Sequence, residues 1–248
     1  MRPIEIDCPN FGALTVVGDR LHEGSDFFVR ANGRQEVLDC LIFLDSRGVS
    51  AGFEQSLANR LITHISRAGG HYLLLCRPLE LTTWATLVNF MELNKLNPAK
   101  IVTNMGFVDF TPKKPAILKD AIQQVEFCAG KGVAKSYALQ ERVESRGEEL
   151  DLHSMVYGDA YRRCIEDVVI RQPTVVINTP LVDPSIRIER ARPKVFFSAL
   201  SDSNAFNHSI GGAHVVDLPN FDEMLTYDAV HYTTRGNEVI FEKVKGFL

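Results

Sequence analysis

The chain has 248 residues, of which 45% are hydrophobic and 23% are charged, and its formal net charge at pH 7 is −4. This is the composition of an ordinary globular protein, long enough to bury most of the surface that its unfolded form would expose. The slight negative charge excludes the broad basic surface expected of a general nucleic-acid-binding protein. No run of apolar residues exceeds five, whereas about 20 are needed to span a bilayer.

The N-terminal sequence MRPIEIDCPNFG has acids and prolines where a secretory signal peptide would have an apolar stretch. The five cysteines are scattered, and none shows the CxxC spacing typical of zinc sites. Their odd number also argues against a disulfide framework. We therefore expect free thiols and a cytoplasmic location, with no metal, no cofactor and no association with a membrane or nucleic acid.

Residues 1–37 predict short strands and turns. The segment 13–19 (ALTVVGD) has the composition of a strand. The segment 26–34 (DFFVRANGR) contains an Asn32-Gly33 pair typical of a hairpin turn. We interpret residues 1–37 as an N-terminal β extension and residues 38–248 as a single α/β domain.

From residue 38 onward, apolar runs typical of buried strands alternate with segments of helical periodicity. The predicted strands are 41–44, 71–76, 99–106, 173–180 and 213–219, and the predicted helices are 52–70, 82–96, 194–206 and 236–247. This alternation predicts an α/β fold in three layers, with a flavodoxin-like parallel sheet between two layers of helices. Such sheets bind ligands beyond the carboxyl ends of their strands, so the residues that follow the strands matter most.

The segment 115–170 is longer than a simple connecting helix requires, and its pattern is largely helical. We predict a helical insertion in the α/β domain. Such an insertion forms either a lid that closes a site to water or a surface for a second copy of the chain, as in a homo-oligomer. The sequence leaves both interpretations open.

Ser46 follows the first predicted strand of the domain, in the sequence IFLDSRG (42–48). A serine between a buried strand and a helix lies near helix amides, which can stabilise an oxyanion. The same position suits an unreactive helix N-cap. The local sequence alone favours the cap.

Asp228 and His231 stand three residues apart in the sequence DAVHYTTRGNEV, just ahead of the last predicted helix. A serine hydroxyl is a poor nucleophile until a base takes its proton, and a histidine serves best as that base when a carboxylate orients it. A lone histidine is usually structural, whereas an Asp-x-x-His pair at a turn is less common. The pair is therefore a candidate partner for Ser46.

Together these two motifs resemble the SGNH/GDSL hydrolase superfamily. The segment 45–65 (DSRGVSAGFEQSLANRLITHI) is similar to the family's first block and its helix, and the segment 228–244 (DAVHYTTRGNEVIFEKV) is similar to its last block, including the glycine five residues after the histidine. The resemblance extends over residues 38–248. It implies a serine esterase or acyltransferase in which His231 deprotonates Ser46, Ser46 attacks an acyl carbonyl and Asp228 orients the imidazole.

The chain departs from this family at the groups that would stabilise the oxyanion. Leu44 replaces the glycine of the family's Gly-Asp-Ser, and Glu80 aligns with the glycine of its second block. In the third block, Gly-x-Asn-Asp, Gly106 is kept but Val108 replaces the asparagine, so that Asn104 is the only nearby amide. The loss of one such donor typically costs about 2.7–4 kcal/mol of transition-state stabilisation.

Two arginines near the predicted site, Arg47 and Arg77, are candidates to bind an anionic part of a substrate. The sequence Gly18-Asp19-Arg20 also resembles the family's Gly-Asp-Ser and would leave the protein without a nucleophile. No amphipathic helix follows it, so a hairpin turn is the better interpretation.

Two functions remain open. The retained triad predicts a hydrolase or acyltransferase for a small-molecule acyl substrate, with weaker substrate or oxyanion roles for Asp45, Arg47, Glu80, Asn104 and Gly106. The missing oxyanion groups predict instead a non-catalytic binding or scaffolding protein on the same fold. A flavodoxin-like binder with an anion near Arg47 is a third hypothesis, although the chain has no phosphate-loop glycine pattern.

Overall fold

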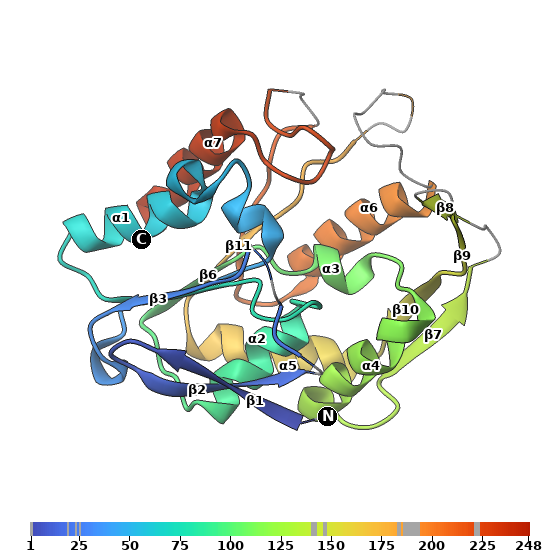
Figure 1. Cartoon of the computed structure of the whole chain (residues 1–248), viewed down its shortest axis with the longest axis horizontal. Coiled ribbons are helices and arrows are strands. Elements are labelled where there is room, and N and C mark those ends of the chain that lie inside the picture. The colour runs from blue at the N-terminus through green and yellow to red at the C-terminus, as the bar shows by residue number, and fades with distance from the viewer. Residues whose placement is uncertain are drawn as a thin grey trace.

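A central six-stranded sheet lies between two layers of helices in the computed structural model of this protein (Figure 1). The structure describes residues 2–18, 20–22, 24, 26–139, 143–145, 148–182, 185, 194–220 and 224–248. In spatial order the strands of the sheet are β12 (His214–Val216), β11 (Thr174–Ile177), β6 (Lys100–Thr103), β4 (Cys40–Leu44), β5 (Tyr72–Cys76) and β3 (Phe28–Asn32). All neighbours are parallel except β3, which pairs antiparallel with β5 at one edge.

The order of the parallel strands shows that the sheet is doubly wound. Along the chain β4 comes first, β5 pairs on one side of it, and β6, β11 and β12 follow on the other side. This is the flavodoxin-like order, so the predicted α/β class with a parallel sheet is confirmed. The direction of winding reverses between β4 and β6, and such sheets bind ligands in the crevice beyond the carboxyl ends of the strands at that point.

Helices cover both faces of the sheet. Their bounds are α1 (Leu57–Arg67), α2 (Trp84–Leu93), α3 (Phe107–Phe110), α4 (Pro115–Ala129), α5 (Asp159–Arg171), α6 (Lys194–Ser209) and α7 (Thr234–Val244). Alternate residues of β4 point to opposite faces: Leu41 and Phe43 enter the core beneath α2 and α5, whereas Ile42 and Leu44 enter the core beneath α1 and α7. Because both faces are covered, β4 is a continuous apolar run instead of an alternating one.

Local capping fixes where the helices that flank the strand ends begin. Ser56 accepts a hydrogen bond from the Asn59 amide at the start of α1. Thr83 caps α2 and forms a reciprocal capping box with Thr86. Thr233 caps α7, which places the turn of residues 228–231 directly before that helix.

The N-terminal residues form strands, but not the hairpin that Asn32-Gly33 predicts. β1 (Arg2–Cys8) and β2 (Gly12–Gly18) pair with each other, and β2 is held against α2 by two hydrogen bonds of 2.7 Å between Thr15 and Asn94. β3 pairs with β5 and not with β4, the next strand along the chain. Both edges of β4 are taken by β5 and β6, so Gly33 turns the chain away from β3 without closing a hairpin.

The insertion 115–170 is helical only at its two ends. Between α4 and α5 lie two antiparallel pairs, β7 (Ala134–Ala138) with β10 (His153–Tyr157) and β8 (Val143–Ser145) with β9 (Glu148–Leu150). The prediction of a largely helical segment is therefore wrong for its middle part. Ala, Lys and Glu favour helices, but intrinsic propensity is readily overridden by tertiary context, and here the pairing of β7 with β10 outweighs it.

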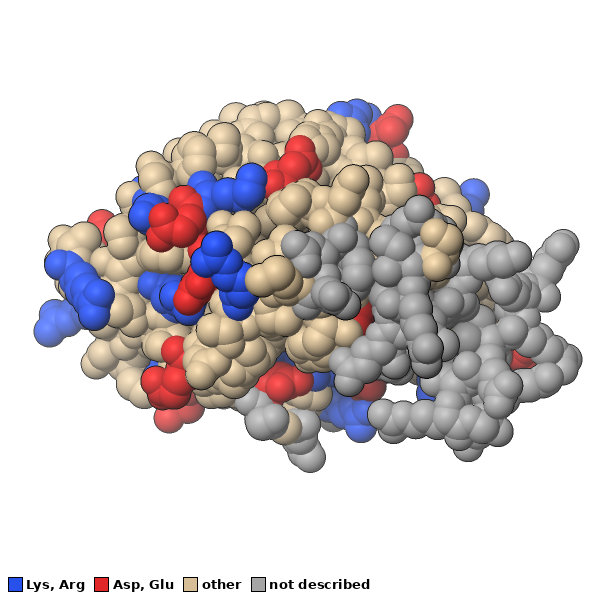
Figure 2. Space-filling view, turned by 90° about the horizontal axis from the view of Figure 1, so that it is seen from above, with Lys and Arg blue, Asp and Glu red and all other residues tan. Residues whose placement is uncertain are grey.

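On the face seen in Figure 2, Lys and Arg side chains lie among Asp and Glu side chains and form no single-signed field. At the contact of α1 with α7, for example, Glu238 pairs with both Arg60 and Arg235, at 3.2 and 3.1 Å. Of the helices that the structure describes, none has the length and apolar character needed to cross a membrane.

Candidate active site

Ser46 lies at the winding reversal of the sheet, directly beyond the carboxyl end of β4. It opens a short 3-10 helix, Ser46–Val49, whose N-cap is Asp45: the Asp45 carboxylate accepts from the Arg47 amide at 2.9 Å. The interpretation of Ser46 as a helix cap is therefore wrong. Because Asp45 fills that role, the half-buried Ser46 hydroxyl is left to face another group.

That group is His231, brought from the other end of the chain by the turn before α7. The Ser46 Oγ lies 3.3 Å from His231 Nε2, and His231 Nδ1 lies 2.9 Å from Asp228 Oδ2. The second carboxylate oxygen of Asp228 accepts from the His231 and Val230 amides at 2.8 and 3.1 Å. The carboxylate is thus fixed by the backbone of its own turn, and it in turn fixes the imidazole plane.

The turn that holds this histidine has an unusual backbone. Ala229 has φ of 67° and is fully buried, a conformation that residues with a Cβ rarely adopt. Such outliers collect at functional sites, where the surrounding structure holds them in place. The Tyr227 ring stacks on the imidazole at 5.7 Å between centroids, and the Tyr227 amide donates to the His231 carbonyl at 3.2 Å.

Beneath Ser46 lies a buried hydrogen-bond network that contains three of the weaker candidates. Arg47 is 1% exposed and pairs with the Asp45 carboxylate at 2.8 Å, while its remaining N–H groups donate to the Thr179 hydroxyl and the Asn104 carbonyl. The Asn104 side chain exchanges two hydrogen bonds of 2.9 Å with Asp45. These three groups are buried and satisfy one another, so their positions do not support the predicted substrate or oxyanion roles.

The other two weaker candidates lie elsewhere. Gly106 faces α6, and a Cβ placed on it would come within 2.8–3.0 Å of the Asn207 amide group and the Ser203 hydroxyl. Glu80 is exposed and pairs with Arg20 at 2.5 Å instead of approaching Ser46. The predicted oxyanion roles of Gly106 and Glu80 are thus not supported by their positions.

One candidate oxyanion donor lies at the serine itself. No hydrogen bond joins the Ser46 backbone amide to any other residue in the described ranges, so this N–H is free to face a substrate oxygen. The Arg77 amide, in the loop after β5, is occupied because it donates to the Leu44 carbonyl at 2.7 Å. Removal of one donor from a typical oxyanion hole slows catalysis about 10²–10³-fold, so a site with a single donor would be slow.

An open cavity of about 880 Å³ joins these groups, within the size range of small-molecule sites. Its lining contains Asp26, Phe28, Ser46, Val49, Ser50, Ala51, Gly52, Phe53, Arg77, Tyr227 and His231. The catalytic candidates lie at one part of this lining, while two aromatic rings, Phe28 and Phe53, stack at 4.7 Å in another. The cavity therefore offers an apolar surface beside a polar reactive group.

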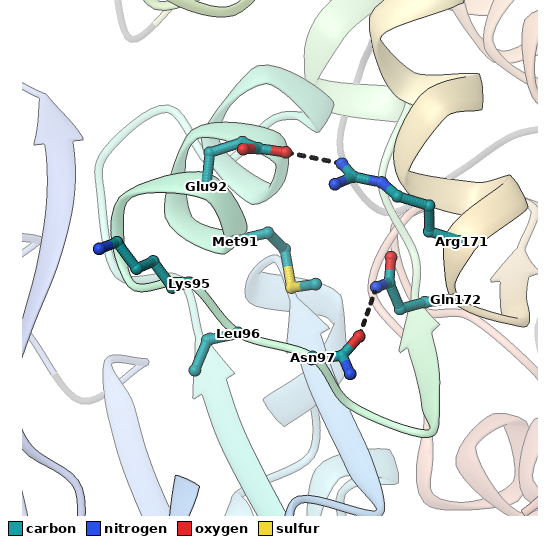
Figure 3. A pocket seen from close by; sticks show the side chains of 7 residues that line it. All are labelled: Met91, Glu92, Lys95, Leu96, Asn97, Arg171 and Gln172. Atoms are coloured by element: carbon teal, nitrogen blue, oxygen red, sulfur yellow. Dashed lines mark hydrogen bonds and ion pairs between the residues drawn. The ribbon is translucent and has the colours of Figure 1, made fainter. Parts of the chain in front are cut away.

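A second cavity, of about 460 Å³, lies near the start of β6 and β11, at the opposite end of the sheet (Figure 3). Four of its polar side chains pair with one another: Glu92 with Arg171 at 2.6 Å, and Gln172 with Asn97 at 3.0 Å. It contains no serine, cysteine or histidine, so it lacks a nucleophile with a base. In the part of the chain that the structure describes, no three His, Cys, Asp or Glu side chains cluster as metal ligands.

Sequence patterns do not identify three contributors to the site. Asp26 and Tyr227 belong to loops that no motif marks. Asn237, in α7, donates its side-chain amide to the carbonyls of Ser50 and Gln55 at 3.1 and 3.2 Å, which ties the loop after Ser46 to the helix after His231. Only its position six residues after the histidine could have drawn attention to it.

A scan against models of known families finds no match for this chain, and neither does a search of curated proteins. Among solved structures, the chain is similar to a protein described as a GDSL-like lipase from Bacteroides ovatus, at 10% identity and a TM-score of 0.40, over 84% of this chain and 51% of that one. It thus spans about half the length of that protein. It is also similar to a protein described as a GDSL-like lipase from Parabacteroides merdae, at 11% identity and a TM-score of 0.39, over 83% and 94% of the two chains.

A further similar structure is Est1E from Butyrivibrio proteoclasticus, at 11% identity and a TM-score of 0.38, over 99% of this chain and 96% of that one. The descriptions of the two lipases name the GDSL class that the sequence motifs of this chain resemble. The strand order and side-chain contacts of this chain define an α/β protein in which hydrogen bonds join a serine to a histidine and that histidine to an aspartate.

Proposed function

We propose that this protein is a serine hydrolase or acyltransferase of the SGNH type, with Ser46 as nucleophile, His231 as base and Asp228 as the orienting acid. The observation that carries the proposal is the chain of contacts from Ser46 to His231 at 3.3 Å and from His231 to Asp228 at 2.9 Å, at the mouth of an open cavity. Catalytic hydrogen bonds are often long before substrate binds, so 3.3 Å is compatible with proton transfer.

In the proposed mechanism the Ser46 proton moves to His231 Nε2 as Oγ attacks the acyl carbonyl. Asp228 stabilises the imidazolium that forms, and the Ser46 amide donates to the oxyanion. Collapse of the tetrahedral intermediate breaks the bond to the leaving alcohol, which takes the proton from Nε2. Water or a second alcohol then repeats these steps on the acyl-serine, which gives hydrolysis or acyl transfer respectively.

The proposal is tested by labelling the purified protein with a fluorophosphonate and mapping the adduct by peptide mass spectrometry. We expect an adduct on Ser46 that disappears in Ser46→Ala and His231→Ala. His64 provides a matched control, because it is also partly buried but packs against Phe241 and faces no serine. His64→Ala is expected to label like the original protein, and equal labelling of His231→Ala would overturn the proposal.

A second candidate function has one specific observation in its favour. Asn104 is engaged with Asp45 and Gly106 faces α6, so their positions do not support the oxyanion roles that the family pattern implies. A protein that binds a small acyl compound without turnover would not need such groups. The same labelling distinguishes the two functions: a folded sample that gives no adduct beside a reactive control hydrolase favours the binding protein.

We also propose that the protein acts in the cytoplasm on a small-molecule substrate. All five cysteines are free thiols, which persist in reducing compartments. Cell fractionation tests the location, and product analysis with and without an added alcohol distinguishes an acyltransferase from a hydrolase.

A further inference from the structure

Arg77 has a backbone conformation that an arginine rarely adopts. It follows β5 directly, and its φ of 47° places it in the left-handed region that favours glycine. The hydrogen bond from its amide to the Leu44 carbonyl holds the backbone in this conformation beside the strand that leads to Ser46. Strained residues of this kind suggest a function for the side chain that they position.

The Arg77 side chain lines the same cavity as Ser46 and His231. Its Nη1 donates to the Asp26 carboxylate at 2.9 Å, and this is its only hydrogen-bond partner among the residues that the structure describes. A guanidinium has five N–H donors, and within the described part of the chain the others have no hydrogen-bond partner, at a side chain that is 28% exposed. Two parallel N–H groups on one edge match the geometry of a carboxylate.

The rest of the cavity wall suits an apolar chain that ends in an anion. The stacked rings of Phe28 and Phe53 provide the apolar surface, and Arg77 is the one cationic side chain among the described residues that line the cavity. The opposing charge is Asp26, 44% exposed and already paired with Arg77. Arg77 also lines a smaller neighbouring hollow of about 310 Å³, where Arg20 pairs with Glu80.

We propose that Arg77 is a specificity-determining residue that binds a carboxylate on the substrate, so that the protein prefers esters bearing a carboxylate at the end of a short methylene chain. This inference rests on the proposed function for the position of the ester at Ser46. The carboxylate would lie on the free edge of the guanidinium, with the methylenes against the aromatic rings. Asp26 would weaken the site by repulsion, because its charge has the same sign as the ligand.

Binding without turnover tests the site independently of catalysis. Monomethyl adipate is titrated calorimetrically into Ser46→Ala protein, alone and with each second substitution. We expect Arg77→Gln to weaken binding at least tenfold, Arg77→Lys to weaken it less because the charge is kept, and Asp26→Asn to tighten it at least threefold. Arg60→Gln is the matched control, since Arg60 is also 28% exposed and paired with a carboxylate, but lies in α1 away from the cavity lining. It should bind as before.

Absence of binding to Ser46→Ala protein, or equal binding by Arg77→Gln, would overturn the inference. Turnover gives the second readout: 4-nitrophenyl hydrogen adipate is compared with its neutral methyl ester, each corrected for spontaneous hydrolysis. We expect kcat/KM to favour the charged ester at least tenfold, and the ratio to fall toward one in Arg77→Gln but not in Arg60→Gln. A Ser46 adduct without this preference would contradict only the inference, whereas ligand binding without any adduct would contradict only the proposed catalysis.

Discussion

The Asp45 carboxylate lies 2.8 Å from the Arg47 guanidinium, and the two side chains are only 3% and 1% exposed. These are the residues on either side of Ser46. The pair is joined to the loop after β6 by Asn104 and to the loop after β11 by Thr179, so three strand ends are tied together beneath the serine. The short 3-10 helix that Ser46 opens is therefore held in place by a buried polar network.

Arg47→Met is expected to destabilise the protein by about 3–5 kcal/mol, because it leaves the Asp45 carboxylate buried without its partner. Urea unfolding followed by circular dichroism measures the loss. Arg235→Met is the control: that arginine also pairs with a carboxylate, but it is 62% exposed, and its removal should cost less than about 1 kcal/mol. If the two variants were equally stable, Arg47 would not hold the network together.

Gly236→Ala is expected to destabilise the protein by about 2–3 kcal/mol or more, although alanine is normally the better helix residue by about 1 kcal/mol. A Cβ on Gly236 would lie 2.1 Å from the Leu225 carbonyl oxygen, so α7 would have to move and take His231 with it. Gly246→Ala has open space around it and should be neutral or slightly stabilising. Thermal unfolding compares the two, and a tolerated Gly236→Ala would refute the close approach.

Asn237→Ala is expected to cost about 1–3 kcal/mol, since the buried Ser50 carbonyl and the partly buried Gln55 carbonyl lose their donor. The loop from Ser50 to Gln55 would also be freed from α7, so fluorophosphonate labelling of Ser46 should slow several-fold. Asn59→Ala removes a comparable amide, but its bond to the Glu54 carbonyl is exposed. In that variant the free energy of unfolding should change by less than about 0.5 kcal/mol. Its labelling rate should stay the same. Equal labelling of both variants would show that the loop does not depend on Asn237.

The α/β class follows from the sequence because it depends on local pattern: apolar runs such as Cys40–Leu44 show burial on both faces. Helix starts are less exact, since the helix expected from residue 52 begins at Leu57 and the one expected from residue 236 begins at Thr234. Strand pairing is different, because it depends on which edges remain free. Asn32-Gly33 has the composition of a hairpin turn, yet β4 has no free edge for β3.

In the candidate site, too, some residues are predictable from local pattern and others are not. Ser46, Asp228 and His231 are marked by spacing and by their places after a strand and before a helix. Whether Arg47 faces a ligand or the core depends on the positions of Asn104 and Thr179. These residues are distant from Arg47 in the chain, so no local pattern reveals the contact. Its charge favours a binding role, whereas the fold buries it with a carboxylate.

Asp109 forms a buried charged cluster away from Ser46. Its carboxylate accepts from the Trp84 amide and the Tyr161 hydroxyl, so it supplies a cap for the first turn of α2 from outside that helix. Lys113 donates to three backbone carbonyls, including that of Asp109 itself at 2.9 Å. Burial raises the pKa of Asp109 to about 6 and lowers the pKa of Lys113 to about 8, while their mutual attraction opposes both shifts.

These shifts give the protein a pH dependence of known sign. Between pH 4 and 6 the folded state holds the Asp109 proton more tightly than the unfolded state does, so this group's contribution to stability falls as the pH rises through that window. A shift of this size corresponds to at most roughly 3 kcal/mol. Asp109→Asn removes the titration and keeps an oxygen acceptor for Trp84 or Tyr161. Urea unfolding at pH 4.5 and pH 7 should therefore show the variant gaining stability relative to the original protein at the higher pH. If the free energies of unfolding of the two proteins differed by the same amount at both pH values, the raised pKa of Asp109 would be contradicted.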